Sequence, residues 1–412
     1  MNHPTQLPGP PDAQKDETKG ERLGRTDLPV AGKPKRLYYL DWLRVFAVLG
    51  VFYSHALSIF NLLYWHVNDS RGTALIVFGT EWGMALFFLL AGASAWFSLG
   101  TRTGRQFISE RFARLVIPCA VGVLLLSPPQ AYLLDVIRSL SHSSFFQYYL
   151  AFFSRLPSAW NPESLAAYGF HLWFLAFLFL FSVLALAPFL SLKSTAGRRV
   201  AGWLARICAR RGGMFVFILP LALIQLTLRA AFPVYQGWSD FFIWFMYFIY
   251  GYVLVSDPRL AKALQQQGMV ALAVGIASLG TLLVTMYGPG FLKVWEGTPG
   301  YSLKYELYQL LWTIIGWSWM LFALYFGMRF LHVNNRLIRY LNEAILPFYV
   351  LHFFMIVMMA FFFAQWRVAT APKFLVVSTL SLASTLIIYE VLIRRVPLAR
   401  RLFGMKPETR EA

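Results

Sequence analysis

Long apolar stretches dominate the chain between residues 37 and 395. A helix needs about 20 apolar residues to cross the hydrocarbon core of a bilayer. These stretches are too long and too continuous for the alternating strands of a membrane barrel. The pattern therefore predicts a polytopic bundle of transmembrane helices. Several stretches contain no Asp, Glu, Lys, Arg or His, namely 82–101, 115–134, 172–192, 241–256, 263–292, 307–328 and 374–389.

Polar breaks between the apolar stretches divide this region into about ten helices. The predicted fold class is all-α, with residues 37–395 as one transmembrane domain. Residues 1–36 are polar and rich in Pro, which predicts a disordered cytoplasmic tail, and residues 396–412 are a second cytoplasmic tail. The predicted helices cover residues 38–62, 73–99, 111–134, 168–191, 213–231, 239–256, 268–287, 306–330, 343–364 and 373–393.

Composition narrows the class of protein. Hydrophobic residues make up 58% of the 412 residues and charged residues only 14%, against about 25% in an ordinary soluble domain. Such a chain has too little polar surface to cover a soluble globule, so a water-soluble enzyme is excluded. Two cysteines are too few for a disulfide framework or a cysteine-based metal site.

The positive charge is distributed as membrane topology requires. A net charge of +18 raises the question of nucleic acid, but Lys and Arg form short clusters between apolar stretches. With ten spans and both termini in the cytoplasm, 28 of the 37 Lys and Arg residues fall on the cytoplasmic side and eight on the other. This asymmetry is the topology signal of a membrane protein. We therefore expect a bilayer and no nucleic-acid partner.

The first predicted helix carries three ionisable residues, Asp41, Arg44 and His55. Arg44 and His55 are eleven residues apart, so at about 100° per residue they share one face of the helix, ~16 Å apart along its axis. Asp41 is three residues before Arg44 and within pairing distance. A cation near the cytoplasmic surface and an imidazole deeper in the membrane suit a long anionic substrate, and histidine is well suited to general-base work.

Structural roles for these residues remain open at this point. Arg44 could be a snorkelling residue that fixes the topology of the helix. His55 could be a hydrogen-bonded packing histidine. The spacing alone does not choose between these roles and a catalytic one.

Five short motifs occur in order along the apolar region. They are Tyr39-Leu40-Asp41-Trp42-Leu43-Arg44 running on to His55, Glu81-Trp82 to Ala91-Gly92, Arg111-Phe112-Ala113-Arg114-Leu115-Val116-Ile117-Pro118, His171-Leu172-Trp173-Phe174-Leu175, and Pro347-Phe348-Tyr349-Val350-Leu351-His352. Together they resemble the acyltransferase-3 family of integral membrane acyltransferases, whose hallmark is an Arg followed eleven positions later by a His. Ala91 stands where the family usually has Ser, which puts a role for that hydroxyl in doubt.

The resemblance implies an O-acyltransferase of the bacterial inner membrane. Such an enzyme moves an acetyl or succinyl group from a cytoplasmic acyl-CoA to a hydroxyl of an envelope or periplasmic carbohydrate. Acyl-CoA is then a donor substrate, and we expect no permanently bound cofactor and no metal. Other enzymes of envelope glycan synthesis are further candidate partners.

The resemblance also implies roles for particular residues. His55, Arg44 and Asp41 form the predicted catalytic set, with His55 as general base or as acceptor of the acyl group. Arg44 would join Arg111 and Arg114 in a basic mouth for the phosphates of the donor, although those two could also be a plain topology cluster. Candidates for the acceptor site or the cavity are Glu81, His171 at the outer rim, and His352 at the depth of His55.

A different class of protein fits the same polar residues. A transporter or flippase without acyl chemistry could use them to line a pathway. Matched pairs of Gly or Pro interruptions in two halves of the chain would favour a transporter, and the sequence has no such pair. A member of the family that only scaffolds other envelope enzymes is a third possibility.

Overall fold

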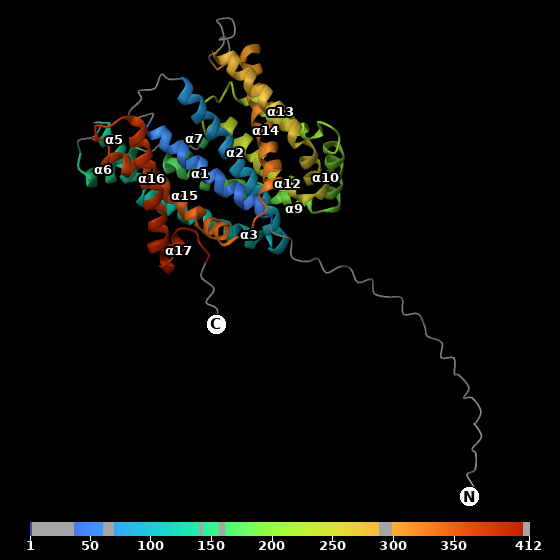
Figure 1. The fold of residues 1–412 in the computed structure, drawn as a ribbon, viewed down its shortest axis with the longest axis horizontal. Helices are drawn as coiled ribbons and strands as arrows, with labels where there is room; N and C mark the ends of the chain where they lie inside the picture. The colour runs from blue at the N-terminus through green and yellow to red at the C-terminus, as the bar shows by residue number, and fades with distance from the viewer. Residues whose placement is uncertain are drawn as a thin grey trace. The chain divides into compact units, whose positions relative to one another are not determined.

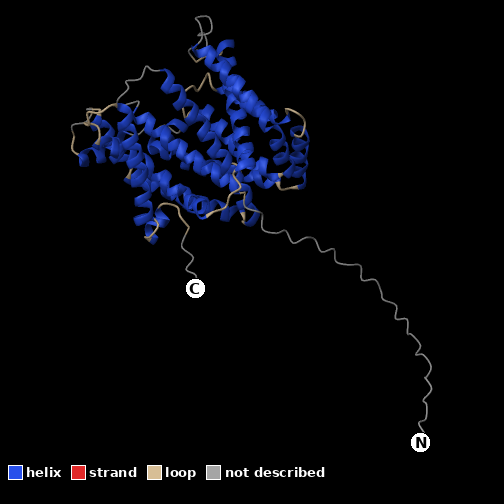
Figure 2. Ribbon diagram, viewed as in Figure 1, coloured by secondary structure: helices blue, strands red, loops and turns tan. Residues whose placement is uncertain are grey.

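The structure is a computed structural model, and it describes residues 1, 37–60, 70–138, 140, 143–155, 161–287 and 299–406. The predicted tail at 1–36 lies outside these residues apart from Met1. Side chains at 70–81, 155, 168 and 286–287 lie outside them as well. Within the described ranges the chain forms helices and no strand, so the predicted all-α class is confirmed (Figure 2).

The first half of the chain contains two long helices followed by a series of shorter ones. Short 3₁₀ segments (η3, η4) and one π-helical segment (η2) join them. In order these are α1 (Tyr38–Phe60), α2 (Ser70–Thr101), α3 (Gly104–Arg111), η2 (Phe112–Val116), α4 (Ile117–Leu125), α5 (Ser127–Ile137), α6 (Phe145–Phe152), η3 (Phe153–Arg155), α7 (Pro162–Gly169), η4 (Phe170–Leu172), α8 (Trp173–Leu184), α9 (Leu186–Leu192) and α10 (Thr195–Cys208).

The second half is built mainly from long helices. A 3₁₀ segment (η5) precedes α11, and a π-helical segment (η7) ends the last long helix. These elements are η5 (Gly213–Phe217), α11 (Ile218–Leu228), α12 (Trp238–Ser256), α13 (Pro258–Tyr287), α14 (Leu303–Phe330), α15 (Arg336–Phe362), α16 (Thr370–Ile388), η7 (Tyr389–Ile393) and α17 (Pro397–Leu402).

Seven helices in the described part of the chain are long and apolar enough to cross a membrane, or nine if each of two bent pairs is one span. The predicted helix at 213–231 corresponds to a shorter apolar helix, Gly213–Leu228. Every predicted helix therefore has a helical counterpart. The count of ten spans and the cytoplasmic position of both termini stay predictions.

Two predicted spans are bent rather than straight. The third begins at Gly104 instead of residue 111 and bends by 41° at Leu126, two residues before Pro128. The fourth bends by 48° at Ala185, three residues before Pro188. Proline has no backbone N–H to give the preceding turn, and its ring clashes with that turn, so these bends have a local cause.

The predicted helix at 268–287 begins ten residues earlier, at Pro258, so the polar run before Gly268 is helical. Gln267 explains why that polar run is tolerated. Its side-chain amide donates to the carbonyl of Cys208 at 2.7 Å and accepts from the backbone N–H of Met214 at 3.3 Å. The polar residues before Gly268 therefore do not end the helix, because Gln267 among them forms tertiary hydrogen bonds.

Helix α1 packs against α2, α14, α15 and α16 (Figure 1). Its remaining face carries the exposed residues Phe46 and Tyr53. Among the described elements, helices α2 and α12 make the most extensive contact. They cross at Gly92 and Gly251, where a Cβ added to either residue would lie 1.8 Å from a carbonyl oxygen of the other helix, that of Phe248 or Leu89. Close approach of the two backbones therefore depends on glycine.

Candidate functional site

Three histidines from distant parts of the chain meet inside the bundle. His55 comes from α1, His171 from η4 and His352 from α15. The ring centroids lie 5.4 Å apart for His55 and His352, 5.0 Å for His171 and His352, and 6.2 Å for His55 and His171. His171 and His352 are buried, and His55 is half-buried. We call these three residues the histidine cluster.

Hydrogen bonds assign the tautomers of the two buried rings. His352 Nδ1 donates to the carbonyl of Tyr349 at 2.7 Å, which leaves its buried Nε2 without a partner. His171 Nε2 donates to the carbonyls of Tyr349 and Val350 at 3.1 and 3.2 Å, which leaves its buried Nδ1 without a partner. Each neutral ring thus keeps one nitrogen lone pair that can accept a proton or a hydrogen bond.

Tyr349 holds the two buried histidines together. Its carbonyl accepts from both rings, and its hydroxyl donates to the backbone carbonyl of His171. The residue before His171 is strained, because Phe170 has a backbone φ of 50°, a conformation that a residue with a side chain rarely adopts. Strain of this kind costs about 1–3 kcal/mol and concentrates at functional sites.

The prediction that His171 lies apart from the other two histidines is wrong. The residue is 5% exposed, and its ring contacts those of both His352 and His55. The short α7 and the strained turn at Phe170 bring it inward, and apolar sequence alone contains no signal for that turn. His352 shares the neighbourhood of His55, as the depth comparison predicted.

Arg44 lies at the opposite end of α1 and is anchored by two helices. Its guanidinium pairs with the buried carboxylate of Asp41 at 2.8 Å. It also donates to the hydroxyl of Ser94 on α2 at 2.5 Å. Asp41 is fourteen residues from His55, or about 21 Å along the helix, so its carboxylate acts on Arg44 and does not reach the histidine cluster.

More arginines gather near Arg44. The guanidinium of Arg111 lies 5.1 Å above the ring of Phe107. It is within electrostatic range of three other guanidinium groups, those of Arg44, Arg102 and Arg114. We call these four residues the arginine cluster. Among the described residues, Asp41 and Glu110 supply the carboxylates that pair with this cluster, and its four guanidinium groups outnumber those two carboxylates.

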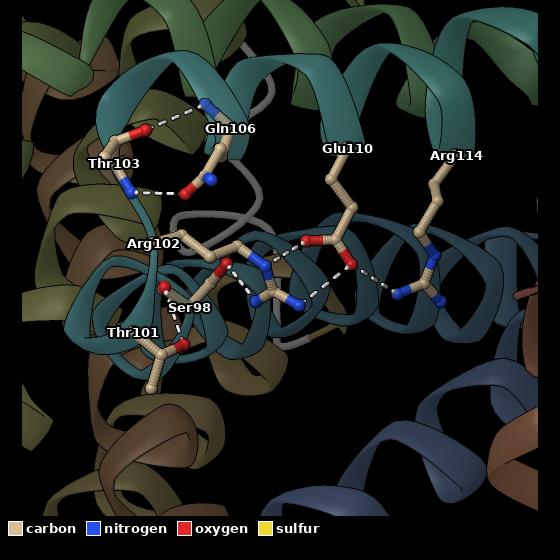
Figure 3. A network of polar contacts seen from close by, with 7 residues as sticks. All are labelled: Ser98, Thr101, Arg102, Thr103, Gln106, Glu110 and Arg114. Carbon is tan, nitrogen blue, oxygen red and sulfur yellow. Dashed lines mark hydrogen bonds and ion pairs between the residues drawn. The ribbon is translucent and has the colours of Figure 1, made fainter.

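Glu110 organises one side of the arginine cluster, and the sequence analysis missed it. Its carboxylate pairs with Arg102 Nε at 3.0 Å and with Arg114 Nη1 at 3.8 Å (Figure 3). Arg114 also donates to the carbonyl of Gly404 at 3.3 Å. The spacing of four residues between Glu110 and Arg114 was the available signal for this pair.

A π-helical segment carries Arg114. Segment η2 (Phe112–Val116) interrupts the regular helix directly after Arg111. A single turn of π-helix shifts the side chains that follow it and is frequent at functional sites. Arg111 lies over Phe107, whereas Arg114 pairs with Glu110.

The two clusters are separated along α1. Arg44 and His55 are eleven residues apart on one helix, which gives ~16 Å along the axis. Helix α2 pairs with Arg44 through Ser94, and its Gly83 faces Val51, one turn before His55. The histidine cluster therefore lies at the level of the first half of α2, and the arginine cluster at the level of the second half.

Two of the predicted site features lie beyond what the structure tests. Glu81 lies in α2, but its side chain is outside the described residues. In the part of the chain that is described, no group of three or more His, Cys, Asp or Glu residues could hold a metal ion. The expected absence of a metal stays a prediction.

The apolar helices are those of a multi-pass membrane protein. Inside it are a cluster of arginines, which attracts anions, and a cluster of buried imidazoles. Residues 37–390 match the model of the acyltransferase domain of the acyltransferase-3 family, so the chain belongs to that family. It is an acyltransferase that transfers groups other than aminoacyl groups. Membership favours the enzyme over the transporter. No solved structure gives a significant match.

Among curated relatives, the chain is similar to proteins named glucans biosynthesis protein C. Those of Salmonella paratyphi A, Salmonella agona and Salmonella schwarzengrund are each 23% identical over 395 residues. The matched region covers 91% of this chain and 96% of each relative. Two short segments near the ends of the transmembrane domain, residues 39–45 and 390–398, are similar in sequence to that protein.

Proposed function

We propose that the protein is an inner-membrane O-acyltransferase that moves an acetyl or succinyl group from a cytoplasmic acyl-CoA to a hydroxyl of a carbohydrate on the other side. The acceptor class follows from the relatives that are named for glucan biosynthesis. Acyl-CoA enters as a substrate rather than as a bound cofactor. The lipid bilayer surrounds the helices. Other envelope glycan enzymes are candidate partners.

One arrangement supports this function above all. Half-buried His55 lies against two buried imidazoles, about 16 Å along α1 from the arginine cluster. An acyl-CoA donor has phosphates at one end, a long arm, and a reactive thioester at the other end. These two ends match the arginine cluster and the histidine cluster. The donor's phosphates would bind the guanidinium groups, which suit phosphate in charge and shape. Its thioester would then lie near the histidine cluster.

The chemical step uses His55 as general base. The imidazole takes the proton of an acceptor hydroxyl while the hydroxyl oxygen attacks the thioester carbonyl carbon. A carbon–oxygen bond forms and the carbon–sulfur bond breaks. The CoA thiolate leaves and takes up the proton from His55. In the covalent alternative His55 first accepts the acyl group and then passes it to the hydroxyl.

Transfer of label tests this function directly. The purified full-length chain, reconstituted in lipid vesicles, is given acetyl- or succinyl-CoA labelled in the acyl group, together with glucose oligosaccharides. We expect labelled ester on the oligosaccharide and free CoA in equal amounts. Mass spectrometry of periplasmic glucans from cells with and without the protein gives the same answer in vivo. Absence of ester in both assays would contradict the proposed function.

Arg111→Ala is expected to weaken donor binding specifically. Removing one guanidinium from a phosphate site costs a charge-assisted hydrogen bond, so KM for acyl-CoA should rise about tenfold or more. The value of kcat should change little. KM for acyl-phosphopantetheine, which lacks the nucleotide and its phosphates, should also change little.

Arg395→Ala is the matched control. Arg395 is exposed and, by the charge count, lies on the same side of the membrane, outside the arginine cluster. It should leave KM for both donors unchanged. An equal rise of KM for the two donors in Arg111→Ala would show that Arg111 does not bind the nucleotide end.

A further inference from the structure

A second polar site lies among aromatic rings and shares no residue with either cluster. It is a cavity of about 60 Å³ between α2, α11, α12 and α14. That volume holds about four water molecules, or the hydroxyl-bearing edge of one sugar ring. We call it the aromatic cavity and define it by six of its lining residues: Trp82, Arg229, Asp240, Trp244, Tyr247 and Trp312.

Buried charge lines one wall of the aromatic cavity. Arg229 and Asp240 form an ion pair, and the two residues are only 7% and 4% exposed. Gln225 accepts from Arg229 Nε at 2.9 Å and from the hydroxyl of Ser239 at 3.3 Å. A buried ion pair is weak evidence for stability, because desolvation offsets much of its attraction. Its position in a cavity points instead to binding.

Strained backbone supports this wall. Gln236 has a φ of 68°, and its N–H donates to the second oxygen of the Asp240 carboxylate at 2.8 Å. Among described residues other than glycine, only Gln236 and Phe170 have positive φ. One lies beside the histidine cluster and the other beside the aromatic cavity, so the chain stores strain at both places.

Stacked rings connect the aromatic cavity with the histidine cluster. Trp244 of the cavity stacks on Trp173, with ring centroids 4.6 Å apart. Trp173 comes two residues after His171. Phe174, next to Trp173, contacts Tyr349, which holds both buried histidines. The cavity and the cluster are thus neighbours separated by a layer of aromatic rings.

The direction of the helices places the cavity away from the arginine cluster. It is lined by residues of the first halves of α12 and α14, and by Leu221 and Gln225 of α11 with Arg229 directly after that helix. On α2 it includes Trp82, twelve residues or ~18 Å before Ser94, which binds Arg44. In the topology that the charge count predicts, these helix ends face the side opposite the donor.

We infer that the aromatic cavity binds one sugar ring of an oligosaccharide acceptor, at a distance from the ring that receives the acyl group. This inference rests on the proposed function, since it names the place where its acceptor binds. Flat aromatic faces cover the apolar face of a sugar, and a few charged or amide groups bind its hydroxyls. Asp240 keeps lone pairs beyond the two that are used.

Two variants test this site with the full-length chain in lipid nanodiscs. Trp312→Leu removes an aromatic face and leaves the ion pair intact, whereas Asp240→Asn removes a charge at constant size. The probe is a ladder of unacylated glucose oligosaccharides of increasing length, measured by calorimetric titration and as acceptors. In the wild type, binding should tighten and acceptor KM should fall with length, because only longer chains reach the cavity.

Each variant should weaken binding of the long oligosaccharides about tenfold and raise their acceptor KM equally, with little change for the shortest. Trp203→Leu, at an exposed Trp on α10, is the control and should change nothing. Thermal unfolding identifies a variant that fails to fold. If Asp240→Asn does not fold, the result for Trp312→Leu tests the sugar site.

The outcomes separate this inference from the proposed function. Oligosaccharide binding that both cavity variants weaken, without any acyl transfer by the wild type, would keep the sugar site and reject the proposed function. Acyl transfer with normal length dependence in Trp312→Leu would reject the sugar site and keep the enzyme. Equal weakening for short and long acceptors would also reject a remote subsite.

Discussion

Replacing His55 with alanine is expected to lower kcat for acyl transfer by about 10²–10⁴-fold, the usual contribution of a general base. The ring is half-buried and contacts His352 and Phe353 at centroid distances of 5.4 and 4.8 Å. The described residues give it no hydrogen bond, so its loss should change the unfolding temperature little. Transfer of labelled acyl groups to oligosaccharide measures the effect.

His332→Ala is the matched control for this prediction. His332 is exposed and lies after the end of α14, outside the histidine cluster. Its removal should leave kcat unchanged. Full activity of the His55→Ala protein with any identified acceptor would overturn the mechanism. Acyl label that stays on wild-type protein without acceptor, and is absent from His55→Ala, would select the covalent route.

Gly251→Val is expected to have the largest effect on stability. A Cβ at this position would lie 1.8 Å from the carbonyl oxygen of Leu89, and backbone cannot move aside as a flexible side chain can. The cost should reach about 4 kcal/mol or more, because α2 and α12 would have to separate. We expect little folded protein after detergent extraction, measured by size-exclusion chromatography and thermal unfolding.

Gly280→Ala distinguishes this clash from a general effect of replacing glycine in a helix. Gly280 lies in α13, is exposed, and has nothing within 4 Å of an added Cβ. Alanine should therefore be neutral or stabilising by up to about 1 kcal/mol. A Gly251→Val protein as stable as Gly280→Ala would show that the α2–α12 crossing is not as close as described.

Sequence alone determined the class of the molecule and the position of its helices. A helix that crosses lipid must satisfy its own backbone and present about 20 apolar residues, so hydrophobicity reports it locally. The same local geometry placed Arg44 and His55 on one face of α1 and paired Asp41 with Arg44. These relations hold within one helix, where residue spacing defines distance.

Packing between distant segments decided the rest. The polar run of α13 is helical because Gln267 bonds to a neighbouring segment, so the start of that helix was misjudged. The strained turn at Phe170 brought His171 inward, and the carbonyl of Tyr349 set the tautomers of two rings. The aromatic cavity joins four helices. Such contacts form between residues far apart in the chain, and only the tertiary structure brings those residues together.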